Sequence, residues 1–215
     1  MTTSSARAGL LVPAGLVLLA AIPVVAGGVR LTELGGGAEV TPDNVRFFDA
    51  PVPVVAHIVG ATVYCVLGAF QFSGGLRLRR PRWHRTAGRV LVPCGLVAAL
   101  TGLWMALCYD LPPGDGDLLM VERLVFGSGM AVSIVLGFAA IRRGDVVHHR
   151  AWMTRAYAIG LGAGTQALTT GFWIAAVGMP GVDARAGVLA AGWLINLAVA
   201  EWVIRRRPAR PSMEA

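Results

Sequence analysis

Six apolar segments, each about 19–24 residues long, dominate the sequence and are separated by short charged or turn-rich loops. A helix needs roughly 20 apolar residues to cross the hydrocarbon layer of a bilayer, which is about 30 Å thick. The sequence therefore predicts an all-α integral membrane protein, a helical bundle in which six transmembrane helices form a single domain over residues 1–215. The segments cover residues of about 8–29, 51–73, 88–109, 118–141, 156–177 and 186–204.

Composition agrees with a membrane protein. Charged residues make up 14% of the chain and hydrophobic residues 55%, whereas soluble domains carry roughly 25% charged residues. All 19 basic residues are arginine, and they give a formal net charge of +7. These arginines lie between apolar segments and are not accompanied by an aromatic-rich basic surface, so we expect no binding of nucleic acid.

The charges of the loops predict the orientation of the chain. Basic loops follow the second and fourth segments, and both ends of the chain are basic, including the tail over residues 205–215. The loops after the first, third and fifth segments are acidic or neutral. Arginine favours the cytoplasmic side, so we expect a multi-pass protein of the bacterial cytoplasmic (inner) membrane with both termini in the cytoplasm.

The first segment has a second interpretation as a cleaved signal peptide. Residues Val24 to Gly27 resemble a cleavage site. The apolar run is nevertheless closer to a full membrane span than to the roughly 7–15 residues of a signal peptide. This length favours a retained first helix.

Two basic stretches resemble each other. Residues Trp83 to Arg89 lead into the third segment, and residues Val147 to Arg155 lead into the fifth. Segments two and three therefore pair as segments four and five do, in the same orientation, which is the pattern of a parallel internal repeat. Because any cytoplasmic loop collects arginines, coincidence accounts for the pattern equally well. In either case, segments two to five should form the core of the bundle.

Motifs in these segments resemble a known family. They are His57 with Gly60, the run from Gly68 to Phe72, Leu76 to Pro81, His84 to Arg89, and Arg142 to Arg155. Together they are similar to a bacterial membrane-protein family of unknown function, domain of unknown function 2306. The resemblance spans segments two to five and implies a multi-helix membrane protein. It matches His149, rather than His148, to the motif and implies no particular reaction.

The leading functional hypothesis concerns the cytoplasmic face. Cations at helix ends contact lipid phosphates, but at a helix N-terminus they oppose the helix dipole by about 0.3–1 kcal/mol. Something anionic should offset them, such as Asp145, a lipid head group or a bound ligand. We therefore expect membrane lipid or a small anionic ligand to bind at this face. The candidate ligand-binding residues are His84, Arg85, Arg89, His149, Arg150 and Arg155.

A haem b electron-transfer protein is the first alternative. His84 and His149 are expected at similar depth on two segments, and paired imidazoles on facing helices commonly hold a haem iron. They would be the axial ligands and the only metal ligands. Against this hypothesis, both residues lie at the membrane edge. His57 lies near the opposite end without a histidine on the fourth segment to face it.

A small proton-coupled transporter is the second alternative. His57 lies about 9 Å into the second segment at 1.5 Å per residue, and ionisable groups at that depth usually face the bundle interior. We expect His57, Glu122 and Arg123 to form a polar cluster, with Gln166 near the midplane. The same residues would equally form an interhelical hydrogen-bond network without a ligand.

Two further expectations concern chemistry and pairing. The sequence contains no GxGxxG, Walker A, GxSxG or HExxH motif, so nothing in it supports nucleotide chemistry or hydrolysis by a soluble-type enzyme. Glu201, close to the cytoplasmic end of the sixth segment, is expected to pair with Arg205 one helical turn later.

Overall fold

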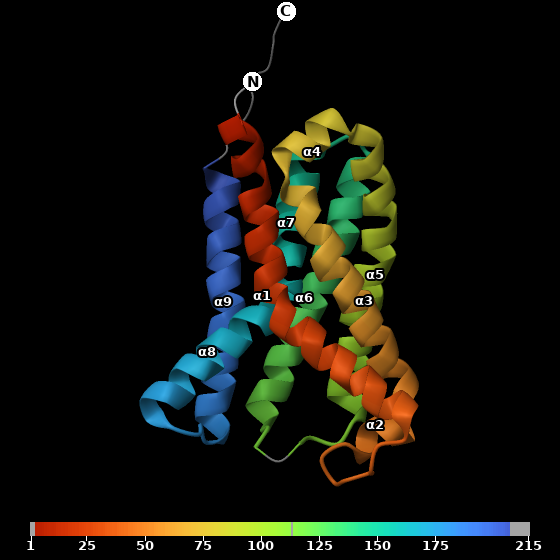
Figure 1. Ribbon diagram of the computed structural model, residues 1–215, viewed down its shortest axis with the longest axis vertical. Helices are drawn as coiled ribbons and strands as arrows, with labels where there is room; N and C mark the ends of the chain where they lie inside the picture. The colour runs from red at the N-terminus through yellow and green to blue at the C-terminus, as the bar shows by residue number, and fades with distance from the viewer. Residues whose placement is uncertain (1–2, 113, 207–215) are drawn as a thin grey trace, which may run out of the picture.

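The computed structural model describes residues 3–112 and 114–206, and every regular element in these ranges is helical (Figure 1). The predicted all-α bundle is therefore confirmed. The helices are α1 (Thr3–Gly36), α2 (Val45–Asp49), α3 (Pro51–Ala69), the 3-10 turn η1 (Phe70–Phe72), α4 (Gly74–Arg79), α5 (Pro81–Cys108), α6 (Asp117–Arg142), α7 (Val146–Gly160), α8 (Gly162–Val177) and α9 (Val182–Arg205).

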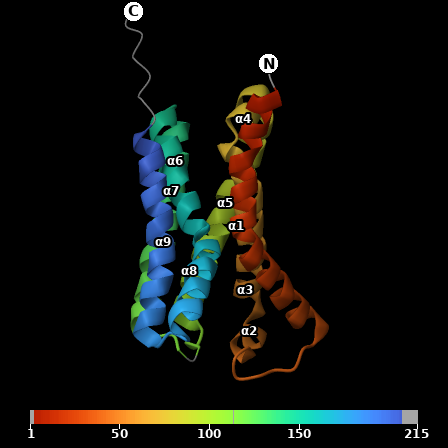
Figure 2. The same cartoon turned by 60° about the vertical axis from the view of Figure 1, so that its left-hand side comes forward.

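Helices α3, α5, α6 and α7 form the central part of the bundle. Each packs against the next in this order, and α7 also contacts α3. Helix α1 packs on α3 and crosses α8, while α9 packs on α6, α7 and α8. In the lower half of the molecule as Figure 2 shows it, α1 and α3 diverge from α8 and α9. The central helices come from the predicted segments two to five, and the internal repeat stays a prediction.

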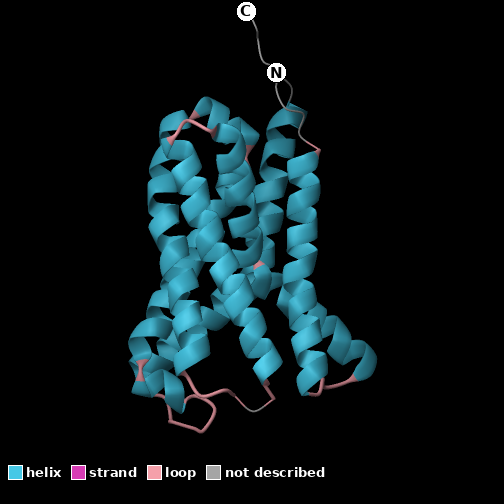
Figure 3. Ribbon diagram, turned by 180° about the vertical axis from the view of Figure 1, so that it is seen from behind, coloured by secondary structure: helices cyan, strands magenta, loops and turns pink. Residues whose placement is uncertain are grey.

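Five helices within the described ranges are long and apolar enough to cross a membrane. They are Leu10–Gly36 of α1, Pro51–Phe72, Pro81–Cys108, Asp117–Arg142 and Val182–Arg205. Only 11–33% of the apolar window of each helix is buried in the protein, so most residues in each window keep some accessible surface, which lipid would cover. The connecting loops gather at the two ends of the bundle (Figure 3). The chain is a membrane protein with several spans.

The fifth predicted segment, residues 156–177, is not one continuous helix, and that prediction was wrong. Helix α7 ends at Gly160 and α8 begins at Gly162, and α8 turns away from α7 (Figure 1). Glycine weakens a helix by about 1 kcal/mol. In addition, side chains of α3 and α9 approach the two glycines closely. A Cβ at Gly160 would lie 2.9 Å from Cε1 of Tyr64, and one at Gly162 would collide with Trp193.

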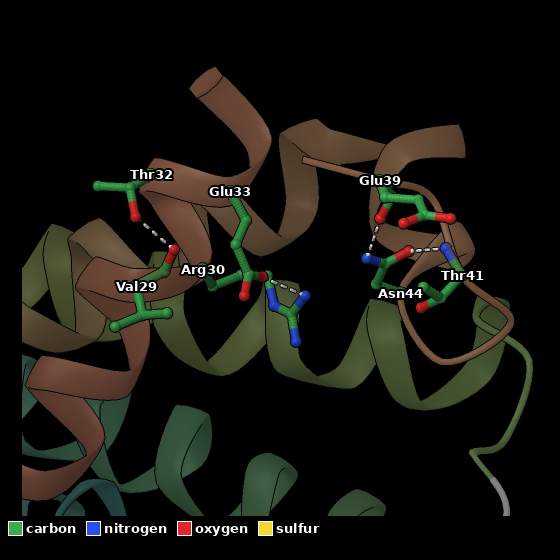
Figure 4. Close-up of polar contacts among 7 residues, drawn as sticks. All are labelled: Val29, Arg30, Thr32, Glu33, Glu39, Thr41 and Asn44. Atoms are coloured by element: carbon green, nitrogen blue, oxygen red, sulfur yellow. Dashed lines mark hydrogen bonds and ion pairs between the residues drawn. The ribbon is translucent and has the colours of Figure 1, made fainter. Parts of the chain in front are cut away.

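Helix α1 is longer than predicted, because residues up to Gly36 extend it beyond the expected end at residue 29. Arg30 pairs with Glu33 at 2.6 Å, and the Thr32 hydroxyl donates to the carbonyl oxygen of Val29 (Figure 4). In the following loop, Asn44 accepts a hydrogen bond from the amide of Thr41 and donates to the carbonyl oxygen of Glu39 (Figure 4). Polar side chains therefore support both the last turn of α1 and the loop to α2.

Helix α5 begins at Pro81 rather than near residue 88, because proline suits the first turn of a helix. His84 and Arg85 therefore lie within the start of α5. At the other end of the chain, α9 continues to Arg205, and residues 207–215 of the predicted basic tail lie outside the described ranges.

The two ends of the bundle differ in charge. The start of α1 and the end of α9 lie at the same end, beside α4 (Figure 1). Asp145 and Glu201 are the only acidic residues among those described at this end, which we call the basic end. At the opposite end, which we call the acidic end, the described arginines are Arg30, Arg46, Arg123 and Arg185, and acidic residues outnumber them.

Candidate functional site

A cavity of about 470 Å³ lies in the half of the bundle nearer the acidic end. Residues of α1, α3, α5, α6, α8 and α9 line it, and α1 and α3 diverge from α8 and α9 in this half of the bundle (Figure 2). Three of the polar residues that line it are His57, Arg123 and Gln166. A mainly apolar cavity of this size with a few polar groups is typical of small-molecule sites. Apolar lining residues include Ala20, Val24, Ala61, Ala99, Met105, Met130, Ile159 and Leu189.

The interruption between α7 and α8 forms part of the cavity wall, through residues Ile159 to Leu161 and Ala163 to Gly164. Broken helices are tolerated within a membrane where they line a cavity or are covered by protein. In secondary transporters, such breaks commonly form the binding site. The coincidence of the break with the cavity makes this region the principal candidate site.

Side chains from other helices satisfy the backbone at the break. The amide of Asn196 on α9 donates to the carbonyl oxygen of Ala158 at 3.0 Å and accepts from the hydroxyl of Thr165 at 2.7 Å. The Cys65 thiol on α3 donates to the carbonyl oxygen of Gly160 at 3.5 Å. These bonds tie both sides of the break to the rest of the bundle.

His57 is held at the cavity by a backbone hydrogen bond. Its Nδ1 lies 2.8 Å from the carbonyl oxygen of Ala98, and the Thr101 hydroxyl lies 3.4 Å from the same nitrogen. A carbonyl only accepts, so Nδ1 carries the proton, and Nε2 keeps its lone pair in the neutral ring. His57 can therefore accept a proton or a hydrogen bond through Nε2.

Arg123 forms an ion pair with a residue outside the predicted polar cluster. Its Nη2 donates to Oδ2 of Asp115 at 2.6 Å, and Nε of Arg185 donates to Oδ1 at 2.7 Å. The Asp115 side chain is completely buried. Asp115 was not predicted as a site residue, because nothing in a short acidic loop indicates that it meets α9. Glu122 does not line the cavity, and its Oε2 is buried without a partner among the described residues.

Gln166 lines the cavity as part of α8 and donates from Nε2 to the carbonyl oxygen of Leu189 at 3.0 Å. Thr169 on the same helix donates to the carbonyl oxygen of Val188 at 3.0 Å. These bonds join α8 to α9. Gln166 therefore fixes the cavity wall in addition to offering it a polar surface.

Aromatic contacts organise the mouth of the cavity at the acidic end. Arg46, Phe47 and Tyr109 line it, and the guanidinium of Arg46 lies 4.5 Å from the centroid of the Phe47 ring. The Phe47 and Tyr109 rings meet edge to face at 5.5 Å, and the Tyr109 hydroxyl donates to the carbonyl oxygen of Ala50 at 2.6 Å. Burial raises the pKa of Tyr109, so the phenol stays a neutral donor that holds α2 against the end of α5.

The predicted residues of the basic end are distributed over several environments. His149 donates from Nδ1 to the carbonyl oxygen of Gly137 at 2.8 Å, whereas Nδ1 of His84 is buried without a partner among the described residues. The two histidines lie close enough to interact electrostatically. Neither lines the cavity. The described ranges contain no group of three or more histidine, cysteine or acidic residues suited to a metal ion.

Ion pairs occupy part of the basic end. Arg155 contacts Glu201 through both carboxylate oxygens, at 2.5 and 3.1 Å, which replaces the expected pair between Glu201 and Arg205. Helix α7 packs beside α9, and this brings the guanidinium group of Arg155 opposite the Glu201 carboxylate. The predicted ligand residues that remain exposed are Arg85, Arg89 and Arg150.

Asp145 supplies one of the anions expected at the basic end. It caps α7, accepting from the amide of His148 at 3.0 Å and contacting Nδ1 of the same residue at 2.6 Å. The backbone hydrogen bond is the main cause that lowers the pKa of Asp145, and the side-chain bond and nearby positive charges add to it.

Comparison with known proteins places these helices in a family. No curated protein and no solved structure matches the chain. Residues 54–204 match the family described as "Predicted membrane protein (DUF2306)". This range runs from α3 almost to the end of α9 and includes the break, His57 and Arg123. Because the match covers well over half of the sequence, the chain belongs to the DUF2306 family of membrane proteins.

Proposed function

We propose that this protein binds a small, mainly apolar molecule in the cavity and acts as a carrier for it in the membrane. The observation that carries the proposal is that a broken membrane helix, α7–α8, lines the same cavity as His57 and Arg123. Broken helices of this kind commonly form the substrate sites of secondary transporters. This proposal follows the transporter hypothesis for His57 and Arg123, and adds Asp115 as the ion-pair partner of Arg123.

His57 gives the proposed carrier a means of coupling to protons. Its Nδ1–H is engaged by the carbonyl oxygen of Ala98, so proton uptake at Nε2 would add a charge beside the ligand. We expect the pH dependence of ligand uptake into proteoliposomes to be lost in His57→Ala. Uptake with an unchanged pH profile in this variant would exclude the coupling role while leaving the binding site intact.

The binding site is tested by filling the cavity. Ala61 lines it from α3, whereas Val59 on the same helix is 51% exposed on the outside of the bundle. A diazirine derivative of dodecanol should label residues 98–106 and 159–166 of the protein in nanodiscs. We expect Ala61→Phe to abolish this labelling and Val59→Phe to preserve it. Labelling confined to outward-facing residues, unchanged by Ala61→Phe, would refute the site.

Lipid or small-anion binding at the basic end is the second candidate function. It is supported by the exposed arginines Arg85 and Arg89 near the start of α5, for which no ion pair occurs within the described residues. Phosphate head groups would suit this site. We expect native mass spectrometry to show weaker retention of phosphatidylglycerol in the Arg85→Gln/Arg89→Gln variant. Arg155→Gln is the comparison, since Glu201 already neutralises Arg155; equal retention in wild type and the double variant would end this proposal.

Haem b remains a separate proposal, favoured by the hydrogen bond from His149 to Gly137, which leaves Nε2 available for a metal. A reduced-minus-oxidised absorption spectrum of purified, haem-supplemented protein tests it. A haem b signal lost in His84→Ala and in His149→Ala would assign both ligands. A flat spectrum from folded protein would exclude the electron-transfer function.

A further inference from the structure

We infer that the ligand of the cavity is an amphipathic anion, with its head group at Arg46 and its apolar body directed toward Tyr64 and Met130. The inference rests on the proposed function, because it names the class of molecule that the cavity takes. It is carried by the pairing of the arginines at the acidic end and by the shape and lining of the cavity.

Arg46 differs from the other described arginines at the acidic end. Arg30 pairs with Glu33, and Arg123 and Arg185 share Asp115. No ion pair within the described ranges includes Arg46, whose guanidinium stacks on Phe47 instead. A guanidinium prefers carboxylate or phosphate oxygens, which it can bind through two parallel hydrogen bonds. The mouth of the cavity therefore presents a half-buried cation that forms no ion pair among the described residues.

The two carboxylates near the mouth are exposed and do not pair with this cation. Asp110 lines the mouth but is exposed, and Asp49, one turn after Arg46 on α2, is also exposed. Neither forms an ion pair among the described residues. Of the trio formed by Asp115, Arg123 and Arg185, only Arg123 lines the cavity, and the two arginines share one carboxylate. Arg46 is therefore the lining arginine without an ion pair among the described residues, and the head group of an anion is placed there.

The body of the cavity suits an alkyl chain. Along α5 it extends from Tyr109 to Ala98, which is about 16 Å at 1.5 Å per residue. Small side chains such as Ala61 and Ala99 line this length, and it reaches the level of Tyr64 and Met130 near the break. Polar groups along the way are few. A long polar ligand would lose its hydration there without replacement hydrogen bonds.

Photolabelling with three probes of equal chain length tests the inference. The probes are diazirine derivatives of dodecanoate, dodecyl phosphate and neutral dodecanol, applied to the protein in nanodiscs of zwitterionic lipid. Hydrogen bonds to charged groups contribute enough for about a tenfold preference. We therefore expect the cavity residues to be labelled about tenfold more efficiently by one or both anions than by dodecanol. The difference between the two anions identifies the preferred head group.

Matched variants locate the head-group site. Arg46→Gln should reduce the preference for the anion to less than about twofold, because it removes the charge at the mouth. Arg30→Gln is the control: Arg30 lies 4.6 Å from the same Phe47 ring but pairs with Glu33 and does not line the cavity. The preference should persist in this variant. Labelling by dodecanol can continue in both, because the apolar body of the cavity is unchanged.

The outcomes separate the two proposals. If all three probes label the cavity equally and Arg46→Gln changes nothing, the inference about the anion is wrong while the binding site stands. If the anions are preferred but the preference survives Arg46→Gln, the assignment of the head group to Arg46 is wrong. If no probe labels the cavity, and filling it at Ala61 has no effect, the proposed function and this inference are both overturned.

Discussion

The side-chain amide of Asn196 on α9 donates to the carbonyl oxygen of Ala158, 3.0 Å away, where α7 gives way to α8. An interrupted helix releases backbone carbonyls that find no water in a bilayer, and each needs another donor. Asn196 also accepts from Thr165 at the start of α8, so one side chain joins three helices at the break. This arrangement explains how a wall built on a broken helix remains ordered.

Replacing Asn196 should therefore loosen the break. We expect Asn196→Leu to lower the free energy of unfolding by about 1 kcal/mol, since interhelical hydrogen bonds in membranes contribute around this value. Unfolding by SDS in mixed micelles measures the change. Leu194→Ala is the comparison, because Leu194 is 58% exposed on the outside of α9. An Asn196→Leu protein as stable as wild type would show that the hydrogen bonds at the break contribute little.

The crossing of α1 and α8 depends on Gly164. Pro23 has no N–H to offer the carbonyl oxygen of Leu19, and a Cβ at Gly164 would collide with that oxygen. We expect Gly164→Ala to separate the two helices and to destabilise the protein by about 1–3 kcal/mol. Gly171→Ala in the same helix is the control, because its Cβ would meet no atom within 4 Å. SDS-induced unfolding should distinguish the variants, and equal stability of the two would contradict the close crossing.

Among the charged residues at the acidic end, Asp115 should contribute most to the stability of the protein, because its carboxylate is buried between two arginines. Asp115→Asn would leave Arg123 and Arg185 facing each other without a compensating charge, which costs about 3–5 kcal/mol when such groups are buried. Because both arginines are about one-third exposed, we expect a loss nearer 2 kcal/mol after solvent screening. The measurement is the free energy of unfolding. Asp183→Asn, an exposed position at the start of α9, should change it little.

Asp145 should make the protein sensitive to acid. The amide of His148 donates to its carboxylate and lowers its pKa below the usual 3.8. A carboxyl group whose pKa is lower in the folded state contributes stability above its unfolded pKa, and loses that contribution as pH falls through the folded pKa. We expect the melting temperature to fall below pH 3.8 by less in Asp145→Asn than in wild type. Equal acid sensitivity of the two proteins would assign the effect to other groups.

The sequence was most informative where the bilayer imposes a simple requirement. Apolar length located α3, α6 and α9 to within a few residues, because a membrane helix must be long and apolar. It did not locate the break at Gly160 to Gly162, since this depends on Tyr64 and Trp193 approaching from distant parts of the chain. Glycines in membrane helices are too common to indicate a break by themselves.

The candidate site was only partly accessible to sequence reasoning. Ionisable residues within apolar segments drew attention to His57 and Arg123, and both line the cavity. The partner of Arg123 was not identified, because Asp115 lies in a loop whose path no local pattern determines. The proposed role of Arg46 was missed for a similar reason: its lack of an ion pair among the described residues depends on how the acidic end folds and leaves no trace in the sequence.

The orientation of the bundle provides the last prediction. Arginines collect at the end that holds α4 and the start of α7, and this asymmetry predicts that the basic end faces the cytoplasm. Thr41 and Val147 are exposed at opposite ends, and Val147 is 70% exposed. After the three native cysteines are replaced by serine or alanine, a membrane-impermeant maleimide should label Thr41→Cys in intact cells. It should label Val147→Cys only after the cells are permeabilised. The reverse pattern would place the mouth of the cavity, and Arg46 with it, on the cytoplasmic side, so that an amphipathic anion would reach the site from inside the cell.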